Sequence, residues 1–193
     1  DVKVHFAEGC HLYRKDPNPV YAFNLMAEAE EAARLSDVAV VVLGLDAGIE
    51  GEEPDNSSQS IGGDKPNLDL PGHQLELLQR VVAVGKPTIL VLMSGSALAL
   101  GWADRHCSAL LSAWYPGQDG GRALAEILFG ETSPSGRLPV TFYESDADLP
   151  SFTDYSMANR TYRYYTGRPV YPFGFGLSYT TFAYHGLTLS KTE

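Results

Sequence analysis

The amino-acid sequence predicts an α/β protein, a three-layer α/β/α sandwich on a mainly parallel sheet. Three observations lead to this prediction. Short apolar runs typical of strands alternate with longer segments in which apolar residues recur at helical spacing. The strand-like runs are apolar at nearly every position, as in strands covered by helices on both faces. Polar and Gly-rich segments follow directly after these runs.

Three segments carry the helical pattern. The first is rich in Ala and Glu and ends at Ser36-Asp37. The second opens on a Leu-Pro-Gly turn and ends at Gly85, and the third ends at Gly130; glycine is a common helix terminator. The predicted helices cover residues 23–35, 70–84 and 121–129, and a short helix or turn is expected at 95–103.

Five segments carry a strand pattern. Residues 38–43 are apolar on both faces and predict a buried strand, and residues 2–6 alternate between apolar and polar. The predicted strands are residues 2–6, 38–43, 87–92, 109–113 and 138–143.

The sequence changes in character beyond Tyr143. Acidic residues and Pro150 are followed by an aromatic-rich run without helical period, which predicts an irregular linker packed on the sandwich. Residues 180–184 and 187–189 are expected to be the first strand or two of a new β element that is only begun in this sequence.

Composition and charge exclude several classes of protein. In the 193 residues, 44% are hydrophobic, which rules out a disordered chain. The formal charge of −10 argues against a nucleic acid or an anionic membrane as a partner, because both require a basic face. No apolar run approaches the roughly 18 residues of a membrane helix.

The predicted topology indicates where a site would lie. In open α/β sheets, ligands bind outside the carboxyl ends of the strands. Three segments follow predicted strands there: residues 44–69, 94–96 and 114–121, which are polar, Gly-rich or aromatic. We expect a functional site where they meet.

The densest ionisable cluster lies in the first of these segments, between Glu50 and Asp55. A general acid needs a carboxyl group whose pKa is raised by burial or by a neighbouring carboxylate, and adjacent acids in a loop can provide one. The same pattern also fits a solvated acidic loop. A calcium loop is disfavoured because the EF-hand ligand spacing is absent.

The other motifs in the sequence give no indication of a cofactor. Trp114-Tyr115 fits either a core position or a platform on which a sugar ring stacks. Gly117 to Gly121 lacks the Lys-Ser/Thr of a phosphate loop, and a tight turn explains its glycines. The five histidines show no metal-ligand spacing, so neither a metal nor a cofactor is predicted.

Five ordered motifs resemble the C-terminal part of family 3 glycoside hydrolases, the β-glucosidases, β-xylosidases and related exo-acting enzymes. The resemblance runs from about residue 2 to the end. The motifs are Leu-Pro-Gly-His-Gln at 70–74, Ala-Trp-Tyr-Pro-Gly-Gln at 113–118, Leu-Phe-Gly at 128–130, Pro-Ser-Gly-Arg-Leu-Pro at 134–139 and Pro-Phe-Gly-Phe-Gly-Leu-Ser-Tyr-Thr at 172–180.

The resemblance implies a domain organisation. In that family an N-terminal barrel precedes an α/β sandwich, and a fibronectin-III-like domain often follows. We therefore expect a sandwich domain at residues 1–143, an aromatic-rich linker at 144–179 and the opening of a fibronectin-III-like domain at 180–193. The barrel of the same protein is an expected partner.

The resemblance also implies a retaining mechanism. A barrel carboxylate forms a glycosyl-enzyme intermediate, and a Glu of the sandwich acts first as acid and then as base. The family pattern is matched by Glu-Gly-Glu-Glu at 50–53 and Gly-Gly-Asp-Lys at 62–65, which makes Glu52 the acid/base candidate. The substrate-binding or second-choice acid candidates are Glu53, Glu50, Asp64, Lys65 and Trp114. Lys65 stands where Arg is common, and Lys lacks the bidentate guanidinium.

The expected function is the acid/base-bearing domain of a β-glucosidase or β-xylosidase, inactive without the barrel. Its substrates would be β-linked oligosaccharides, glucosides or xylosides. Two alternatives are a carbohydrate-binding accessory module without catalysis and, more weakly, a flavodoxin-like nucleotide-binding domain. Sugar and linkage are not predicted, because the family's tightest specificity contacts come largely from the barrel. A periplasmic or secreted location fits the resemblance, but no compartment is predicted.

Overall fold

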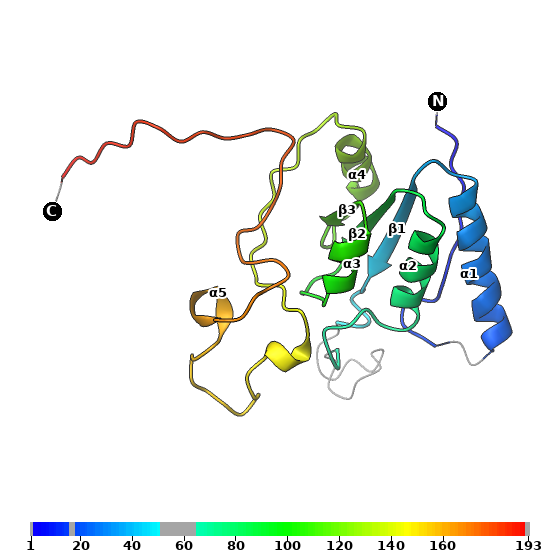
Figure 1. Cartoon of the computed structure of the whole chain (residues 1–193), viewed down its shortest axis with the longest axis horizontal. Helices are drawn as coiled ribbons and strands as arrows, with labels where there is room; N and C mark the ends of the chain where they lie inside the picture. The colour runs from blue at the N-terminus through cyan, green and yellow to red at the C-terminus, as the bar shows by residue number, and fades with distance from the viewer. Residues whose placement is uncertain (1, 16–17, 51–64, 192–193) are drawn as a thin grey trace.

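A parallel sheet of three strands forms the centre of the computed structural model, which describes residues 2–15, 18–50 and 65–191 (Figure 1). The strands are β1 (Ala39–Gly44), β2 (Thr88–Met93) and β3 (Ala109–Ser112), in the order β1-β2-β3. Both pairs are parallel, so the carboxyl ends of all three strands lie at one edge of the sheet. The connections contain helices, as parallel pairing requires.

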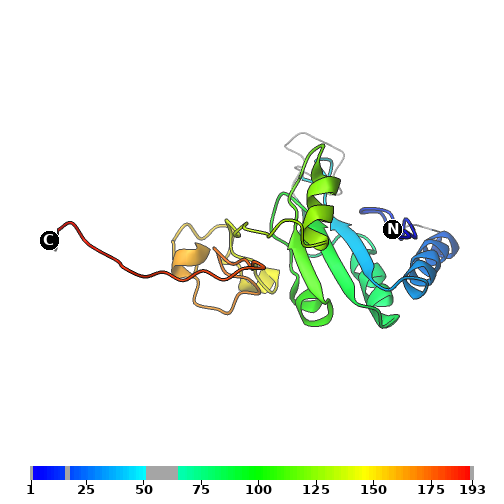
Figure 2. The ribbon, with the colours of Figure 1, turned by 90° about the horizontal axis from the view of Figure 1, so that it is seen from above.

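The helices lie on both faces of the sheet. The view in Figure 2 has α2 (Gln74–Ala83) and α3 (Gly101–His106) on one face and α4 (Gly120–Leu128) on the other. The outermost helix, α1 (Pro19–Arg34), packs against α2 and is tied to it by an ion pair between Arg80 and Glu30 at 2.6 Å. It begins at Asn18, whose side chain accepts the N–H of Val20, as an N-cap residue does. The fold class is therefore α/β, as the sequence predicts.

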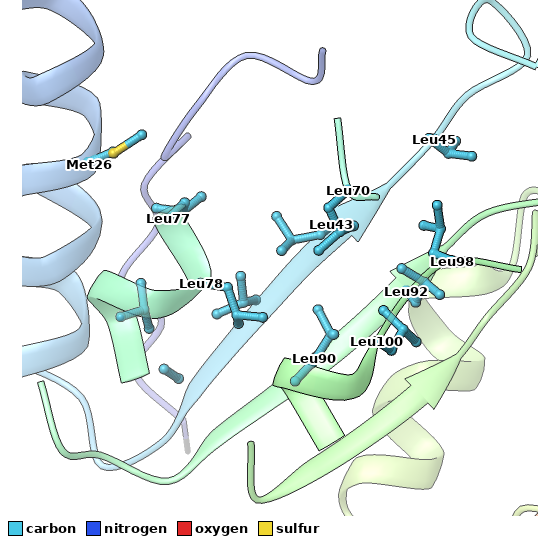
Figure 3. Packing of buried hydrophobic residues seen from close by; sticks show 14 of the residues in the cluster. Met26, Leu43, Leu45, Leu70, Leu77, Leu78, Leu90, Leu92, Leu98 and Leu100 are labelled. Carbon is cyan, nitrogen blue, oxygen red and sulfur yellow. The ribbon is translucent and has the colours of Figure 1, made fainter. Parts of the chain in front are cut away.

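The core lies between the sheet and the helices α2 and α3. Leu78, Leu90 and Leu98 are fully buried there, and Met26 reaches the same cluster from α1 (Figure 3). Burying such side chains stabilises a fold by about 1.5–3 kcal/mol each. This core fixes the sheet whose carboxyl edge carries the site.

Coverage of the second face is less complete than predicted. Val91 on β2 is buried, but Val40 and Val42 on β1 are 48% and 52% exposed. The expectation that residues 38–43 are covered on both faces is therefore wrong for this part of the structure. In the described residues, α4 lies over β2 and β3 and no element covers the outer face of β1.

In the described residues, the strands predicted at 2–6, at 138–143 and beyond residue 180 do not form. Residues 2–6 have no strand partner in the described ranges, and Val2, Val4 and Phe6 are exposed. Of residues 138–143, only Phe142 pairs, in an isolated antiparallel bridge with Tyr171. Residues 180–191 form no strand and extend away from the rest of the chain (Figure 1). A continuous strand needs a neighbour that supplies a regular series of hydrogen bonds. In the described structure residues 2–6 and 180–191 have no such neighbour, and residues 138–143 have one only around Leu138 and Phe142, which bond to the backbone of residues 170–175.

Helix boundaries also differ from the prediction. The first helix begins at Pro19 and not at residue 23. The second helix begins at Gln74 because Gly72 is in the left-handed region at φ +63°, where a Cβ would lie 2.9 Å from the backbone of Tyr13. The short helix expected at 95–103 is α3, at Gly101–His106.

The aromatic segment after Tyr143 contains η1 (Asp146–Asp148) and α5 (Thr161–Tyr164). Its later residues contact the sandwich: Tyr171 Oη donates to Asp104 Oδ1 at 2.6 Å, and Tyr179 Oη donates to the carbonyl of Ile127 at 2.7 Å. These contacts hold the chain against α3 and the end of α4.

Candidate active site

The loops that follow β1, β2 and β3 meet around the carboxylate of Glu50. Its Oε2 accepts the backbone N–H of Gly95 at 2.9 Å and the hydroxyl of Tyr115, and its Oε1 accepts the hydroxyl of Ser96. The three predicted segments at the carboxyl edge therefore lie together, and one side chain joins them.

The chain around Glu50 is shaped by a short local turn. Asp46 Oδ1 accepts the N–H groups of Gly48 at 2.9 Å and Ile49 at 3.0 Å, which is the geometry of an Asx-turn. The side chain of Ile49 is buried in the core. The turn and this anchor direct Glu50 back across the edge of the sheet.

The segment after β2 is a compact turn held by Ser94. This buried side chain donates to the carbonyl of Ser96 at 2.6 Å and accepts the Ser96 N–H at 3.3 Å. Gly95 lies between them, and a Cβ there would be 2.8 Å from both Glu50 Oε2 and Tyr115 Cε2. A larger residue at 95 would therefore displace at least one of these two side chains, although the φ of Gly95 is not positive.

Trp114 and Tyr115 follow β3 on a strained backbone. Trp114 has φ +53°, in the left-handed region that bulky residues rarely adopt. Its ring is partly buried, and Tyr115 is 48% exposed. Such strain occurs often at functional sites, where the surrounding structure holds it.

Lys65 lies at the same edge. Its Nζ donates to the carbonyl of Ala97, the residue after Ser96, and its charge interacts with those of Glu50 and Asp146. Burial lowers the pKa of the Lys65 ammonium group, and these two carboxylates oppose that effect.

The surroundings shift the pKa values of Glu50 and Tyr115 in opposite directions. Burial alone would raise the pKa of Glu50, but the hydrogen bonds from Ser96, Tyr115 and Gly95, together with the Lys65 charge, outweigh it and lower this pKa. Burial and the bond to Glu50 raise the pKa of Tyr115 to about 12. At neutral pH, Glu50 is therefore an ionised acceptor and Tyr115 a protonated donor, so Glu50 holds no proton that it could give to a leaving group.

Gln74 fixes the end of β1, from which the loop to Glu50 starts. It is 1% exposed; its Oε1 accepts the Gly44 N–H at 2.7 Å, and its Nε2 donates to the carbonyls of Gly44 at 2.7 Å and of Leu12. The sequence motif contains Gln74, but no pattern in the sequence indicates that it is buried or what it binds.

Of the predicted site residues, Glu50, Lys65 and Trp114 lie at this edge of the sheet. Glu52, Glu53 and Asp64 lie outside the described residues. The sequence located segment 94–96 at this edge through its position directly after a strand, but it assigned no role to Gly95 or Ser96. It did not indicate Gln74 as a site residue.

Two further findings concern the described part of the chain. Nowhere in it do three or more His, Cys, Asp or Glu side chains gather so that they could hold a metal ion. None of the helices found there has the length and apolar character needed to cross a membrane.

Comparison with known proteins matches residues 14–179 to the model of the glycosyl hydrolase family 3 C-terminal domain. Xylan 1,4-beta-xylosidase of Xylanibacter ruminicola is 47% identical over 156 residues, which are 79% of this chain and 18% of that protein. Periplasmic beta-glucosidase of Salmonella typhimurium is 38% identical over 179 residues, 86% of this chain and 22% of that protein.

Among solved structures, the GH3 exo-beta-xylosidase XlnD, determined in complex with a xylobiose aziridine activity-based probe, superposes with a TM-score of 0.77 at 31% identity. The match covers 93% of this chain and 23% of that one. The chain thus spans about a fifth to a quarter of the length of these relatives.

Proposed function

This chain belongs to the C-terminal domain of glycosyl hydrolase family 3, and from that premise we propose that it is the acid/base-bearing part of a retaining, exo-acting β-glycosidase. The substrate class is a β-linked glucoside, xyloside or oligosaccharide, as the names of the relatives suggest. The observation that carries the proposal is the meeting of all three strand-end loops at Glu50, two residues before Glu52.

The proposed chemistry divides two carboxyl groups between two domains. A carboxylate of an N-terminal barrel attacks the anomeric carbon, and Glu52 protonates the departing glycosidic oxygen. Glu52 then deprotonates the water that hydrolyses the glycosyl-enzyme. Retention requires the two groups to lie about 5–5.5 Å apart. In this proposal residues 1–193 hydrolyse nothing alone, because the nucleophile comes from the barrel.

The acid is assigned to Glu52 rather than Glu50 on physical grounds. An acid must be protonated at the working pH. Both oxygens of Glu50 already accept hydrogen bonds, and its pKa is lowered. Glu53 and Asp64 remain second choices by position in the sequence, and the strained, partly buried Trp114 is proposed to contact the sugar.

The domain organisation also remains a proposal: a sandwich at 1–143, a linker at 144–179 and a fibronectin-III-like opening at 180–193. The contacts of Tyr171 and Tyr179 with α3 and α4 support the role of the linker.

The test uses the full-length protein that carries this chain, with Glu52→Gln compared with Glu53→Gln as a matched control. With an alkyl β-xyloside or β-glucoside, whose leaving group needs protonation, kcat/KM of Glu52→Gln is expected to fall about 10²–10⁴-fold. With a dinitrophenyl glycoside, glycosyl-enzyme formation is expected to be spared.

Three outcomes would contradict the proposal in different ways. Loss in Glu53→Gln with full activity in Glu52→Gln would move the acid to Glu53. A wild-type protein that hydrolyses no β-glycoside would refute the enzyme function. Sugar binding by residues 1–193 alone, in a wild-type protein without hydrolysis, would favour an accessory module.

A further inference from the structure

Trp114 lies between two residues that are held by contacts with other parts of the sheet edge. Ala113 directly precedes it and donates its backbone N–H to the carbonyl of Leu92 on β2 at 2.8 Å. Tyr115 directly follows it and donates its hydroxyl to Oε2 of Glu50, on the loop after β1. The backbone of Trp114 therefore connects two fixed points.

The contact of Tyr115 involves its ring as well as its hydroxyl. A Cβ at position 95 would lie 2.8 Å from Tyr115 Cε2 and 2.8 Å from Glu50 Oε2, so the ring edge lies against Gly95. Glu50 Oε2 also accepts the Gly95 N–H at 2.9 Å. Hydrogen bonds to an ionised carboxylate are about twice as strong as bonds between neutral groups. Glu50, Gly95 and Tyr115 thus form one contact between three loops, here termed the clasp.

The backbone of Trp114 adopts a conformation that a residue of its kind rarely adopts. Its φ is +53°. For a residue with a Cβ, the left-handed region is disfavoured about five- to thirtyfold. Pro116 adds a second restriction, because a proline biases the residue before it, Tyr115, toward extended backbone. Holding Tyr115 in place therefore keeps Trp114 left-handed, and releasing Tyr115 allows Trp114 to change its conformation.

The indole of Trp114 has surface that the described structure does not use. Trp114 is partly buried, and no described residue accepts a hydrogen bond from its Nε1–H or stacks on its ring. An indole offers a hydrogen-bond donor at its edge and an apolar face, which together suit a sugar ring. It follows β3 at the carboxyl edge of the sheet, where ligands of α/β proteins bind.

We propose that the clasp holds Trp114 in its left-handed conformation and so presents the indole to the sugar ring of the substrate. The proposal rests on the proposed function, in which Trp114 contacts the sugar. In this role Glu50 and Tyr115 are positioning residues, since they act through Trp114 and do not touch the substrate.

The expected consequence is weaker substrate binding. Tyr115→Phe keeps the ring against Gly95 and removes only the hydroxyl that binds Glu50. Because a released Trp114 returns to conformations that are favoured about five- to thirtyfold, KM should rise about five- to thirtyfold. A contact made equally before and during the reaction changes KM alone, so kcat should stay within about twofold of wild type.

The experiment measures kcat and KM of the full-length protein on a β-linked disaccharide of xylose or of glucose. It compares Tyr115→Phe, Trp114→Ala and the double variant. The matched control is Tyr21→Phe, because Tyr21 is an exposed tyrosine on α1 whose hydroxyl bonds to no described residue. The control should keep the wild-type KM. Once the indole is absent the Tyr115 hydroxyl has nothing to position, so the double variant should have the KM of Trp114→Ala.

Three results would overturn the proposal. A Tyr115→Phe variant with the KM of Tyr21→Phe would mean that the hydroxyl positions nothing. A further rise in KM from Trp114→Ala to the double variant would mean that Tyr115 acts independently of Trp114. A Trp114→Ala variant with the wild-type KM would mean that the indole does not contact the substrate.

A second measurement does not depend on activity. In the full-length protein labelled with fluorotryptophan, the fluorine resonance of Trp114 is the one that is lost in Trp114→Phe. It should broaden or split in Tyr115→Phe, because the released indole occupies more than one position, and stay unchanged in Tyr21→Phe. A single unbroadened line in Tyr115→Phe would overturn the role of the clasp. If the wild-type protein hydrolyses no β-glycoside, the proposed function fails, and this resonance still shows whether Tyr115 holds Trp114.

Discussion

Replacing Gln74 by Leu should remove the side-chain hydrogen bonds that fix the carboxyl end of β1. Leu is similar in size but offers neither donor nor acceptor, so the buried N–H and carbonyl of Gly44 lose their partners. An unsatisfied buried polar group costs about 1–3 kcal/mol, so the free energy of unfolding should fall by about 2–5 kcal/mol. The Leu12 carbonyl is partly exposed and can bind water instead.

The control is Gln79→Leu, the same chemical change at an exposed position of the same helix. Urea unfolding of the 193-residue chain, followed by the fluorescence of its two tryptophans, measures both variants. Both tryptophans, Trp102 and Trp114, lie in or beside the sandwich. Gln79→Leu should change the free energy of unfolding by less than about 0.5 kcal/mol. A Gln74→Leu variant as stable as Gln79→Leu would refute the reasoning.

Two other perturbations test the edge of the sheet by the same unfolding assay. Gly44→Ala should lower the free energy of unfolding by about 2–4 kcal/mol, because a Cβ at this φ of +140° would lie 1.8 Å from the Met93 carbonyl oxygen. The control, Gly121→Ala in the open first turn of α4, should be neutral or slightly stabilising. Equal stability of the two variants would contradict the close packing at Gly44. Glu50→Gln should be less stable than wild type at pH 7. Because the folded-state pKa of Glu50 lies below its ordinary value of 4.5, the stabilisation is complete above that value and is lost as the pH falls through the folded-state pKa; a stability gap that widens toward acid pH would show the opposite sign.

The fold was predictable where a segment with a strand pattern lies beside another strand of the sheet. The strands predicted at 38–43, 87–92 and 109–113 are found as β1, β2 and β3, within one residue at each end, because they lie beside one another in one sheet. Residues 2–6 carry an equally clear alternation but have no neighbouring strand in the described structure. Periodicity specifies which faces of a segment are apolar, and it does not specify whether another strand is present.

The site was predictable in its place but less so in its contacts. The rule about the carboxyl ends of strands located the three loops, since it depends only on chain order. It did not reveal that both oxygens of Glu50 are occupied, because the donors come from Gly95, Ser96 and Tyr115 on other loops. The burial of Gln74 likewise depends on how α2 packs on β1, which local sequence does not encode.

The most direct test of the central claim, that this domain supplies the acid/base through Glu52, is azide rescue of Glu52→Ala in the full-length protein. The variant should turn over a dinitrophenyl glycoside slowly, and azide should accelerate it and yield the β-glycosyl azide, with retained configuration. No acceleration and no glycosyl azide, with wild-type turnover of an alkyl glycoside by the same variant, would contradict the account.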